Sequence, residues 1–163
     1  MKTVVVYFSL EGNTKYVAEK IASELDADII TLKPMKPYPT GKFSKYFWCG
    51  KSSAFKEAPK LKPYHFDSAP YDLIVLGTPI WAGTFTPPIR TFLNDHKLAG
   101  KNVALFACCS GGQTEKCFEQ IKTKLPQATV VATRRFIDPI KNLKSGEDNG
   151  LLEFCAELKA QEY

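Results

Sequence analysis

Continuous runs of apolar and β-branched residues alternate along the chain with segments in which apolar residues recur every three or four positions. The continuous runs are typical of strands buried on both faces of a parallel sheet. The wider spacing is typical of helices that pack on a sheet through one face. Strands are therefore predicted over residues 3–8, 27–32, 71–77, 102–108 and 128–137.

The segments between these runs predict the helices. Apolar residues at positions 17, 18, 21, 22 and 25 form one helical stripe after the first strand. Another helix is predicted from Thr86-Pro87-Pro88 onward, because proline suits a first helical turn. Two more are predicted over residues 117–125 and from about Ser145, whose spacing to Asp148 resembles a capping box. Residues 43–55 predict a further short helix.

Alternating strands and helices with right-handed crossovers predict an α/β fold: a doubly wound five-stranded parallel sheet with helices on both faces. The expected strand order, counted along the chain, is 2-1-3-4-5. In that order the direction of the chain across the sheet reverses between the first and third strands, and ligands bind at the carboxyl ends of the strands beside that reversal. The 163 residues, of which 44% are hydrophobic, predict one domain over residues 1–163.

A lysine- and aromatic-rich excursion, residues 33–66, separates the second and third predicted strands. Residues 33–62 contain eight lysines and one acid, Glu57. The aromatic residues Phe43, Tyr46 and Phe47 suit one face of a short helix that packs down, with the lysines as its solvated face. This pattern argues against nucleic-acid binding, and a partial lid over a ligand site is a second arrangement open to the excursion.

The loop after the first strand has the chemistry of a phosphate site. It consists of Ser9, Leu10, Glu11, Gly12, Asn13 and Thr14. The first N–H groups of the following helix lack intrahelical partners, and the helix dipole adds positive potential there. Hydroxyl and amide side chains can donate to phosphate oxygens, and glycine permits close approach of the backbone. A simple turn with Asn13 or Thr14 as a helix cap is the structural alternative.

Two further loops are expected to converge on the same edge of the sheet. They contain Thr78, Pro79, Ile80, Trp81, Ala82 and Gly83 after the third strand, and Cys109, Ser110, Gly111 and Gly112 after the fourth. A tryptophan at the tip of such a loop would bury its apolar face by stacking on a planar heterocycle. Folding of Trp81 back onto the sheet edge or onto the excursion at residues 33–66 is the alternative.

Other chemistry is not indicated. The motifs G-x-x-x-x-G-K-S/T and G-x-G-x-x-G are absent from the first loop, which argues against a nucleoside triphosphatase or a common dinucleotide site. Five cysteines without a C-x-x-C pair and two histidines predict no disulfide framework and no metal site. No long apolar segment or signal peptide is present, so we expect a cytoplasmic protein with no membrane partner. No catalytic side chain is assigned.

The loop at residues 9–14 resembles the phosphate loop of flavodoxins, S/T-x-T-G-N-T, and matches four of its five specified positions. The departure is Glu11, which stands in place of threonine and is expected to contribute only its backbone N–H. Trp81 and the Ser-Gly-Gly at 110–112 are also similar to flavodoxin-like proteins. The resemblance implies noncovalent FMN, bound by the three loops. No aromatic residue occurs at 109–113, so one ring face is expected to be open or covered by Tyr46, Phe47, Trp48 or a partner.

The resemblance implies electron transfer between redox partner proteins, a donor reductase and an acceptor. The alternative is an FMN-dependent NAD(P)H:quinone-type oxidoreductase, because residues 77–83 are also similar to the G-T-P-x-x-x-G loop of those enzymes. We favour the carrier and leave open whether the protein is an enzyme. The net charge of +5 predicts a less negative potential for complete flavin reduction than acidic flavodoxins have. Ala82 stands where flavodoxins commonly have glycine, so a turn there should be strained.

Overall fold

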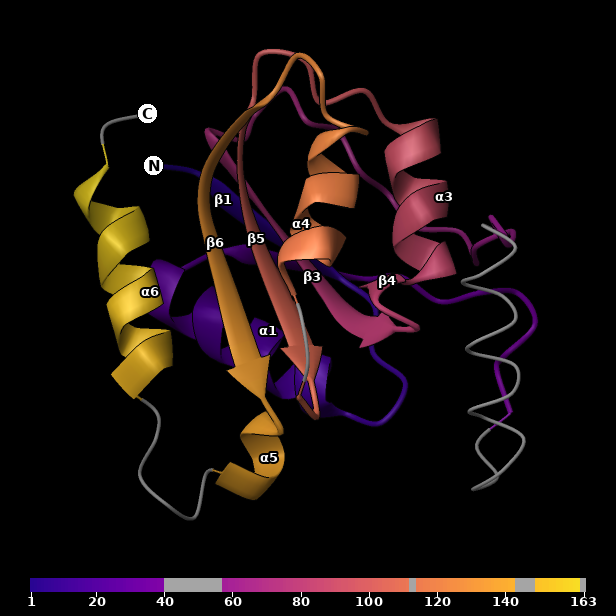
Figure 1. Ribbon diagram of the computed structural model, residues 1–163. Helices are drawn as coiled ribbons and strands as arrows, with labels where there is room; N and C mark the ends of the chain where they lie inside the picture. The colour runs from indigo at the N-terminus through magenta and orange to yellow at the C-terminus, as the bar shows by residue number, and fades with distance from the viewer. Residues whose placement is uncertain (40–56, 112–113, 143–148, 162–163) are drawn as a thin grey trace.

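The computed structural model describes residues 1–39, 57–111, 114–142 and 149–161. Within them, five parallel strands form a sheet in the order β2-β1-β3-β5-β6 (Figure 1). Their bounds are β1 Thr3–Tyr7, β2 Asp28–Thr31, β3 Leu73–Trp81, β5 Asn102–Cys109 and β6 Thr129–Ile137. This confirms the predicted parallel sheet and its order, and adds one short strand, β4 (Thr84–Phe85), which pairs antiparallel with β3.

Helices cover both faces of the sheet. Figure 1 shows α1 and α6 on one side and α3 and α4 on the other. Their bounds are α1 Asn13–Leu25, α3 Pro87–Asp95, α4 Glu115–Lys122 and α6 Asn149–Ala160. A short helix, α5 (Pro139–Asn142), comes after β6 and was not predicted. The helix expected over residues 43–55 and the capping box expected at 145–148 lie outside the described residues.

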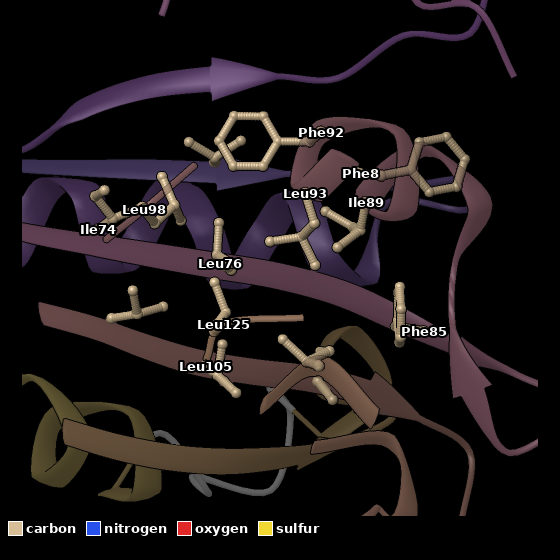
Figure 2. Packing of buried hydrophobic residues seen from close by; sticks show 14 of the residues in the cluster. Phe8, Ile74, Leu76, Phe85, Ile89, Phe92, Leu93, Leu98, Leu105 and Leu125 are labelled. Carbon is tan, nitrogen blue, oxygen red and sulfur yellow. The ribbon is translucent and has the colours of Figure 1, made fainter. Parts of the chain in front are cut away.

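Each face of the sheet has its own apolar core. On the α3 and α4 side, Ile74 and Leu76 project from β3 toward the helix that carries Ile89, Phe92 and Leu93, and Leu105 lies beside Leu125 (Figure 2). On the opposite side, alternate strand residues such as Val5, Val75 and Phe106 pack against apolar residues of α1 and α6. The central strands β1, β3 and β5 are therefore buried on both faces, which explains their uninterrupted apolar runs, whereas the edge strands β2 and β6 are partly exposed.

The strand after Gly77 is longer than its sequence predicted. Residues 78–81 were expected to be a loop, but β3 continues to Trp81 and turns back into β4, with Ile80 opposite Phe85 and Trp81 opposite Thr84. The turn has positive φ at both central residues, 49° at Ala82 and 75° at Gly83. A two-residue turn of this kind matches the twist of paired strands, so the aromatic and β-branched residues on either side extend the sheet instead of forming an open loop.

The described part of the excursion packs onto the sheet edge and α3. Pro34 forms an isolated antiparallel bridge with Leu61. The Thr91 hydroxyl donates to the carbonyl of Pro59 at 2.8 Å, and the Tyr64 hydroxyl lies 2.8 Å from His96 Nε2 at the end of α3. These contacts hold residues 59–64 against the α3 side of the molecule.

Candidate functional site

The loop after β1 presents the amino end of α1 to the carboxyl edge of the sheet. The Ser9 hydroxyl accepts a hydrogen bond from the Gly12 N–H at 3.1 Å, and Gly12 has φ 97°, which favours glycine. The first intrahelical bond runs from the Tyr16 N–H to the Gly12 carbonyl at 2.8 Å. Neither Asn13 nor Thr14 caps the helix, since no side-chain cap hydrogen bond is formed at Gly12. The N–H groups of the first turn therefore remain available to an anion.

Thr14 is the most informative residue of this loop. It is 1% exposed and lies in the wall of a cavity, yet its hydroxyl oxygen has no hydrogen-bond partner in the structure. The neighbouring polar group is the Cys108 thiol: burial raises the pKa of Cys108 to about 12, and the Thr14 side chain opposes this by a weak interaction that falls short of hydrogen-bond geometry. A buried hydroxyl without a strong partner costs about 1–3 kcal/mol, and a phosphate oxygen in the cavity would satisfy it.

The β3–β4 hairpin forms the second side of the site through Trp81. Its indole packs edge-on against Tyr38, with ring centroids 5.0 Å apart, and against Phe8, at 5.6 Å. The packing holds the indole beside the cavity, and Trp81 remains partly exposed there. Trp81 therefore folds back onto Tyr38 and Phe8, as the alternative to ring stacking expected, and still contributes to the cavity wall.

The third side combines the loop after β5 with the turn after β6. The Ser110 hydroxyl donates to Asp138 Oδ1 at 2.8 Å, and the Asp138 N–H donates to the Cys109 carbonyl at 2.8 Å. The Ile140 N–H donates to Asn13 Oδ1 at 3.2 Å, so α5 is hydrogen-bonded to the loop at residues 9–14 after β1. Three segments distant in sequence are thereby joined at one edge of the sheet.

These segments enclose a cavity of about 370 Å³, within the size range of small-molecule sites. Its lining consists of Ser9, Leu10, Glu11, Asn13, Thr14, Pro79, Ile80, Trp81, Ala82, Cys108, Cys109, Ser110 and Asp138. Residues from all three predicted loops thus come together. Gly12, Thr78, Gly83 and Gly111 lie next to the lining without forming part of it, and Gly112 is outside the described residues.

Thr78 is an example of a predicted residue whose side chain is engaged inside the protein. Its hydroxyl lies 3.1 Å from the Thr86 hydroxyl and accepts the Thr86 N–H at 3.1 Å. It also donates to the carbonyl of Pro79 at 2.9 Å. These bonds connect the base of the hairpin to the start of α3, so Thr78 supports the position of Trp81.

Sequence reasoning missed Cys108 and Asp138. Asp138 comes after the last strand at its carboxyl end, the same edge to which the other loops were assigned, and that position was the available signal. Glu11 and Asp138 are the charged residues in the described part of the lining, and Glu11 is exposed. Among the described residues of this lining there is no lysine or arginine, so an anion bound there would depend on backbone N–H groups and neutral side chains.

Two negative findings concern the described residues alone. No group of three or more histidine, cysteine, aspartate and glutamate residues among them has the arrangement of a metal site. No helix in the described ranges is long and apolar enough to span a membrane.

A doubly wound sheet with the amino end of a helix beside a cavity at its switch point is typical of nucleotide-binding α/β proteins. The family model described as flavodoxin matches residues 2–142, and the chain belongs to that family. No curated protein matches the chain.

Solved structures of flavoproteins resemble the chain along most of its length. A flavoprotein from Lactobacillus acidophilus NCFM, solved in complex with FMN, is 25% identical, with a TM-score of 0.73 over 88% of this chain and 97% of that one. The apo form of the flavoprotein from the same organism, solved by NMR, is 26% identical, with a TM-score of 0.66 over 86% and 95%. Oxidised flavodoxin 2 from Bacillus cereus shares the fold at 18% identity, with a TM-score of 0.61 over 96% and 97%. These comparisons confirm the resemblance stated from the sequence.

Proposed function

We propose that the protein binds FMN noncovalently in the 370 Å³ cavity and carries electrons between redox partner proteins, a donor reductase and an acceptor. The observation that carries the proposal is the buried Thr14 hydroxyl, unpartnered at the amino end of α1. It requires an oxygen acceptor or donor at the place where the helix favours an anion. Family membership and the FMN complex of the Lactobacillus acidophilus flavoprotein support FMN as the occupant.

Different residues around the cavity would contact different parts of the cofactor. The N–H groups of the first turn of α1, together with Ser9 and Thr14, would hold the phosphate. The partly exposed indole of Trp81 would cover the planar ring, and its edge contacts with Phe8 and Tyr38 restrict its rotation before a ring arrives. FMN, when bound, supplies the redox chemistry, and the protein controls its orientation and exposure.

Asp138 and Ser110 are assigned to the polar part of the cofactor. Their mutual hydrogen bond positions one hydroxyl and one carboxylate on the same side of the cavity. Asp138 also lies 3.5 Å from Lys141 Nζ, which partly compensates its charge. The carboxylate can accept hydrogen bonds from hydroxyl groups of the cofactor chain.

Calorimetry with FMN and riboflavin tests the cofactor assignment. FMN should bind at least about 100-fold more tightly than riboflavin, because riboflavin lacks the phosphate that several donors at the helix terminus would contact. Equal affinity for the two compounds would contradict the placement of the phosphate at α1. A protein that binds neither would contradict the functional proposal as a whole.

The alternative is an FMN-dependent NAD(P)H:quinone-type oxidoreductase. Its support is the similarity of residues 77–83 to the corresponding enzyme loop. Steady-state oxidation of NADPH by the FMN-loaded protein with a quinone separates the two functions. The carrier proposal predicts no turnover above that of free FMN, and reduction of the bound FMN only when a partner reductase is added. Turnover that saturates with NADPH would select the enzyme.

A further inference from the structure

A second cavity adjoins the first one. Its volume is about 620 Å³, and it shares Ser9 and Leu10 with the proposed FMN site. It lies at the carboxyl end of the edge strand β2, between the first turns of α1 and the segments around residues 33–38 and 62. Neither Thr14 nor Trp81 lines it, so it is a separate site. We call it the β2 cavity.

Two lysines of the β2 cavity lie directly opposite one another. Pro34 bridges Leu61 in antiparallel fashion, and the Lys62 N–H donates to the Lys33 carbonyl at 2.7 Å. This pairing places the Lys33 and Lys62 side chains on the same face, with Cβ atoms about 4.5–5.5 Å apart. No ion pair of the described residues includes either lysine. Like charges in this arrangement repel, and a bound anion would remove the repulsion.

A third lysine enters the cavity from an electrostatically unfavourable position. Lys15 is in the first turn of α1, where the helix dipole favours acidic residues, and that turn contains no acid. Its Nζ lies 3.6 Å from Glu19 Oε1, but both side chains are more than half exposed, so the pair contributes little. Among the described residues of the lining, the three lysines and the carboxylate of Glu19 leave an excess of two positive charges.

The remaining walls suit an apolar body. Ile29 is 44% exposed on β2, and Pro37 and Tyr38 form the wall near the first cavity. One polar contact is prepared: the buried Tyr7 hydroxyl accepts a hydrogen bond from Thr31 at 2.9 Å, which leaves its own hydrogen for a ligand. An anionic group would thus lie at the lysines while an aromatic or aliphatic group contacts Ile29 and Pro37.

We propose that the β2 cavity binds a phosphorylated small molecule of mononucleotide size. A phosphate monoester is a dianion near neutral pH, which matches the excess charge of the lining, and lysine binds phosphate as a point charge. The volume falls within the range of small-molecule sites. The inference does not depend on FMN binding, because the lysines that would bind the phosphate line the β2 cavity and not the first one.

The test uses the full-length protein saturated with FMN, so that the first site is blocked, and adenosine 5′-monophosphate as the probe. Calorimetry should show binding at least about tenfold tighter than that of adenosine, which lacks the phosphate. Amide resonances of Thr31 and Lys33 should shift on titration, while those of Asn13 and Thr14 remain unchanged. Should the protein fail to bind FMN, the same resonances still distinguish the β2 cavity from the helix terminus.

Lys62→Glu is the decisive variant. It should weaken binding of the probe at least about tenfold, because it removes one phosphate donor and adds a carboxylate. It should also raise the melting temperature, since it replaces a repulsive cross-strand pair by an attractive one. Loss of binding therefore cannot be attributed to unfolding. Lys116→Glu, at an exposed position of α4, changes the net charge equally and should leave binding unaltered.

Three results would overturn the proposal. They are equal affinity for the phosphorylated and unphosphorylated probe, unaltered binding to the Lys62→Glu variant, and an equal loss in the Lys116→Glu variant. The last result would show that only the overall charge of the protein attracts the nucleotide.

Discussion

At the scale of single residues, substitutions at two buried threonines can distinguish an effect on cofactor binding from an effect on stability. Thr3 and Thr14 are each 1% exposed, and the hydroxyl of each lacks a hydrogen-bond partner. Thr14 lines the cavity at the carboxyl ends of the strands, whereas Thr3 begins β1 at their amino ends. The same chemical change at the two positions therefore tests whether the cavity uses its hydroxyl.

Thr14→Val should weaken FMN binding about 10- to 100-fold, the value of a hydrogen bond to a charged group, as measured by fluorescence titration. The free energy of unfolding of the cofactor-free protein should rise by up to about 1 kcal/mol, because an unsatisfied buried hydroxyl is removed. Thr3→Val should raise stability similarly and leave FMN affinity unaltered. Equal FMN affinity of the two variants would contradict a role for Thr14 in binding.

Gly77 is required by the residue on the adjacent strand. A Cβ atom there would lie 2.1 Å from Cζ of Phe106, whose ring is fully buried. Gly77→Ala should therefore lower the free energy of unfolding by about 1–3 kcal/mol in denaturant titrations. The control is Gly150→Ala in α6, where a Cβ meets nothing within 4 Å. That substitution should stabilise by about 0.5–1 kcal/mol, and equal effects would contradict the steric explanation.

At the scale of elements, the β3–β4 hairpin contains measurable backbone strain. Ala82 and Gly83 both have positive φ, as a two-residue turn with matching twist requires. Ala82→Asn should raise the free energy of unfolding of the cofactor-free protein by about 0.5–1 kcal/mol, because asparagine tolerates this conformation better. Gly83→Ala should lower it by about 1 kcal/mol through conformation alone, since a Cβ there meets no atom within 4 Å. Thermal melts of the two variants should shift in opposite directions.

The contact between α3 and the segment around residue 64 should make stability depend on pH. Burial lowers the pKa of His96, and a weaker effect of Asp95 opposes it, while burial raises the pKa of Tyr64 to about 12. The neutral imidazole can accept the Tyr64 hydrogen bond, but the protonated form cannot. Because the pKa of His96 is lower in the folded state, the folded protein loses stability as the pH falls from the unfolded pKa of about 6.5 through the lower folded pKa.

Chemical denaturation at pH 7 and pH 5 measures this effect. The fall in unfolding free energy on acidification should be smaller in His96→Gln, whose side chain accepts the hydrogen bond without titrating. His65→Gln, at an exposed position, should retain the full fall seen in the unmodified protein. An identical pH dependence of His96→Gln and the unmodified protein would contradict the assignment.

At the scale of the whole molecule, charge near the flavin has two components. The net charge of +5 includes the lysines of the β2 cavity, which adjoins the proposed FMN site through Ser9 and Leu10. Glu11 and Asp138, by contrast, line the proposed FMN cavity itself. The overall charge favours addition of electrons, and the lining opposes it at short range.

Complete reduction of bound FMN should occur at a less negative potential than in acidic flavodoxins, and high salt should make it more negative by screening the exposed lysines. Spectroelectrochemical titration at low and high ionic strength measures both values. A potential that rises with salt would show that Glu11 and Asp138 dominate.

The main parts of the fold could be predicted from local patterns. The apolar runs indicated β1, β3 and β5 most clearly, because strands buried on both faces have no polar side to interrupt them. The edge strands β2 and β6 are partly exposed and were indicated by their β-branched residues and their place between helices. The β4 strand was not predicted, since its two residues form a strand only through pairing with Ile80 and Trp81. The short helix α5 was likewise missed, because Asp138-Pro139 indicated the end of a strand but gave no sign of a helical turn after it.

The three loops of the candidate site were also identified from the sequence, since sheet topology alone places them at one edge. Which of their side chains line the cavity depended on tertiary contacts. The Thr78 hydroxyl is hydrogen-bonded to Thr86 inside the protein, and Asp138, outside the predicted loops, is hydrogen-bonded to Ser110 in the lining. The sequence does not indicate which hydroxyl groups form hydrogen bonds inside the protein and which face a cavity without a partner.

The sequence by itself predicted the parallel sheet with its strand order and a candidate anion-binding loop, because the alternation of strands and helices and the local chemistry of a helix terminus are visible in the chain. Only the tertiary structure decided that Thr14 is the unpaired hydroxyl, that Trp81 is fixed by Phe8 and Tyr38, and that three lysines from separate segments meet at the β2 cavity. Those features depend on distances between residues far apart in the chain, which burial and packing establish only when the chain is folded.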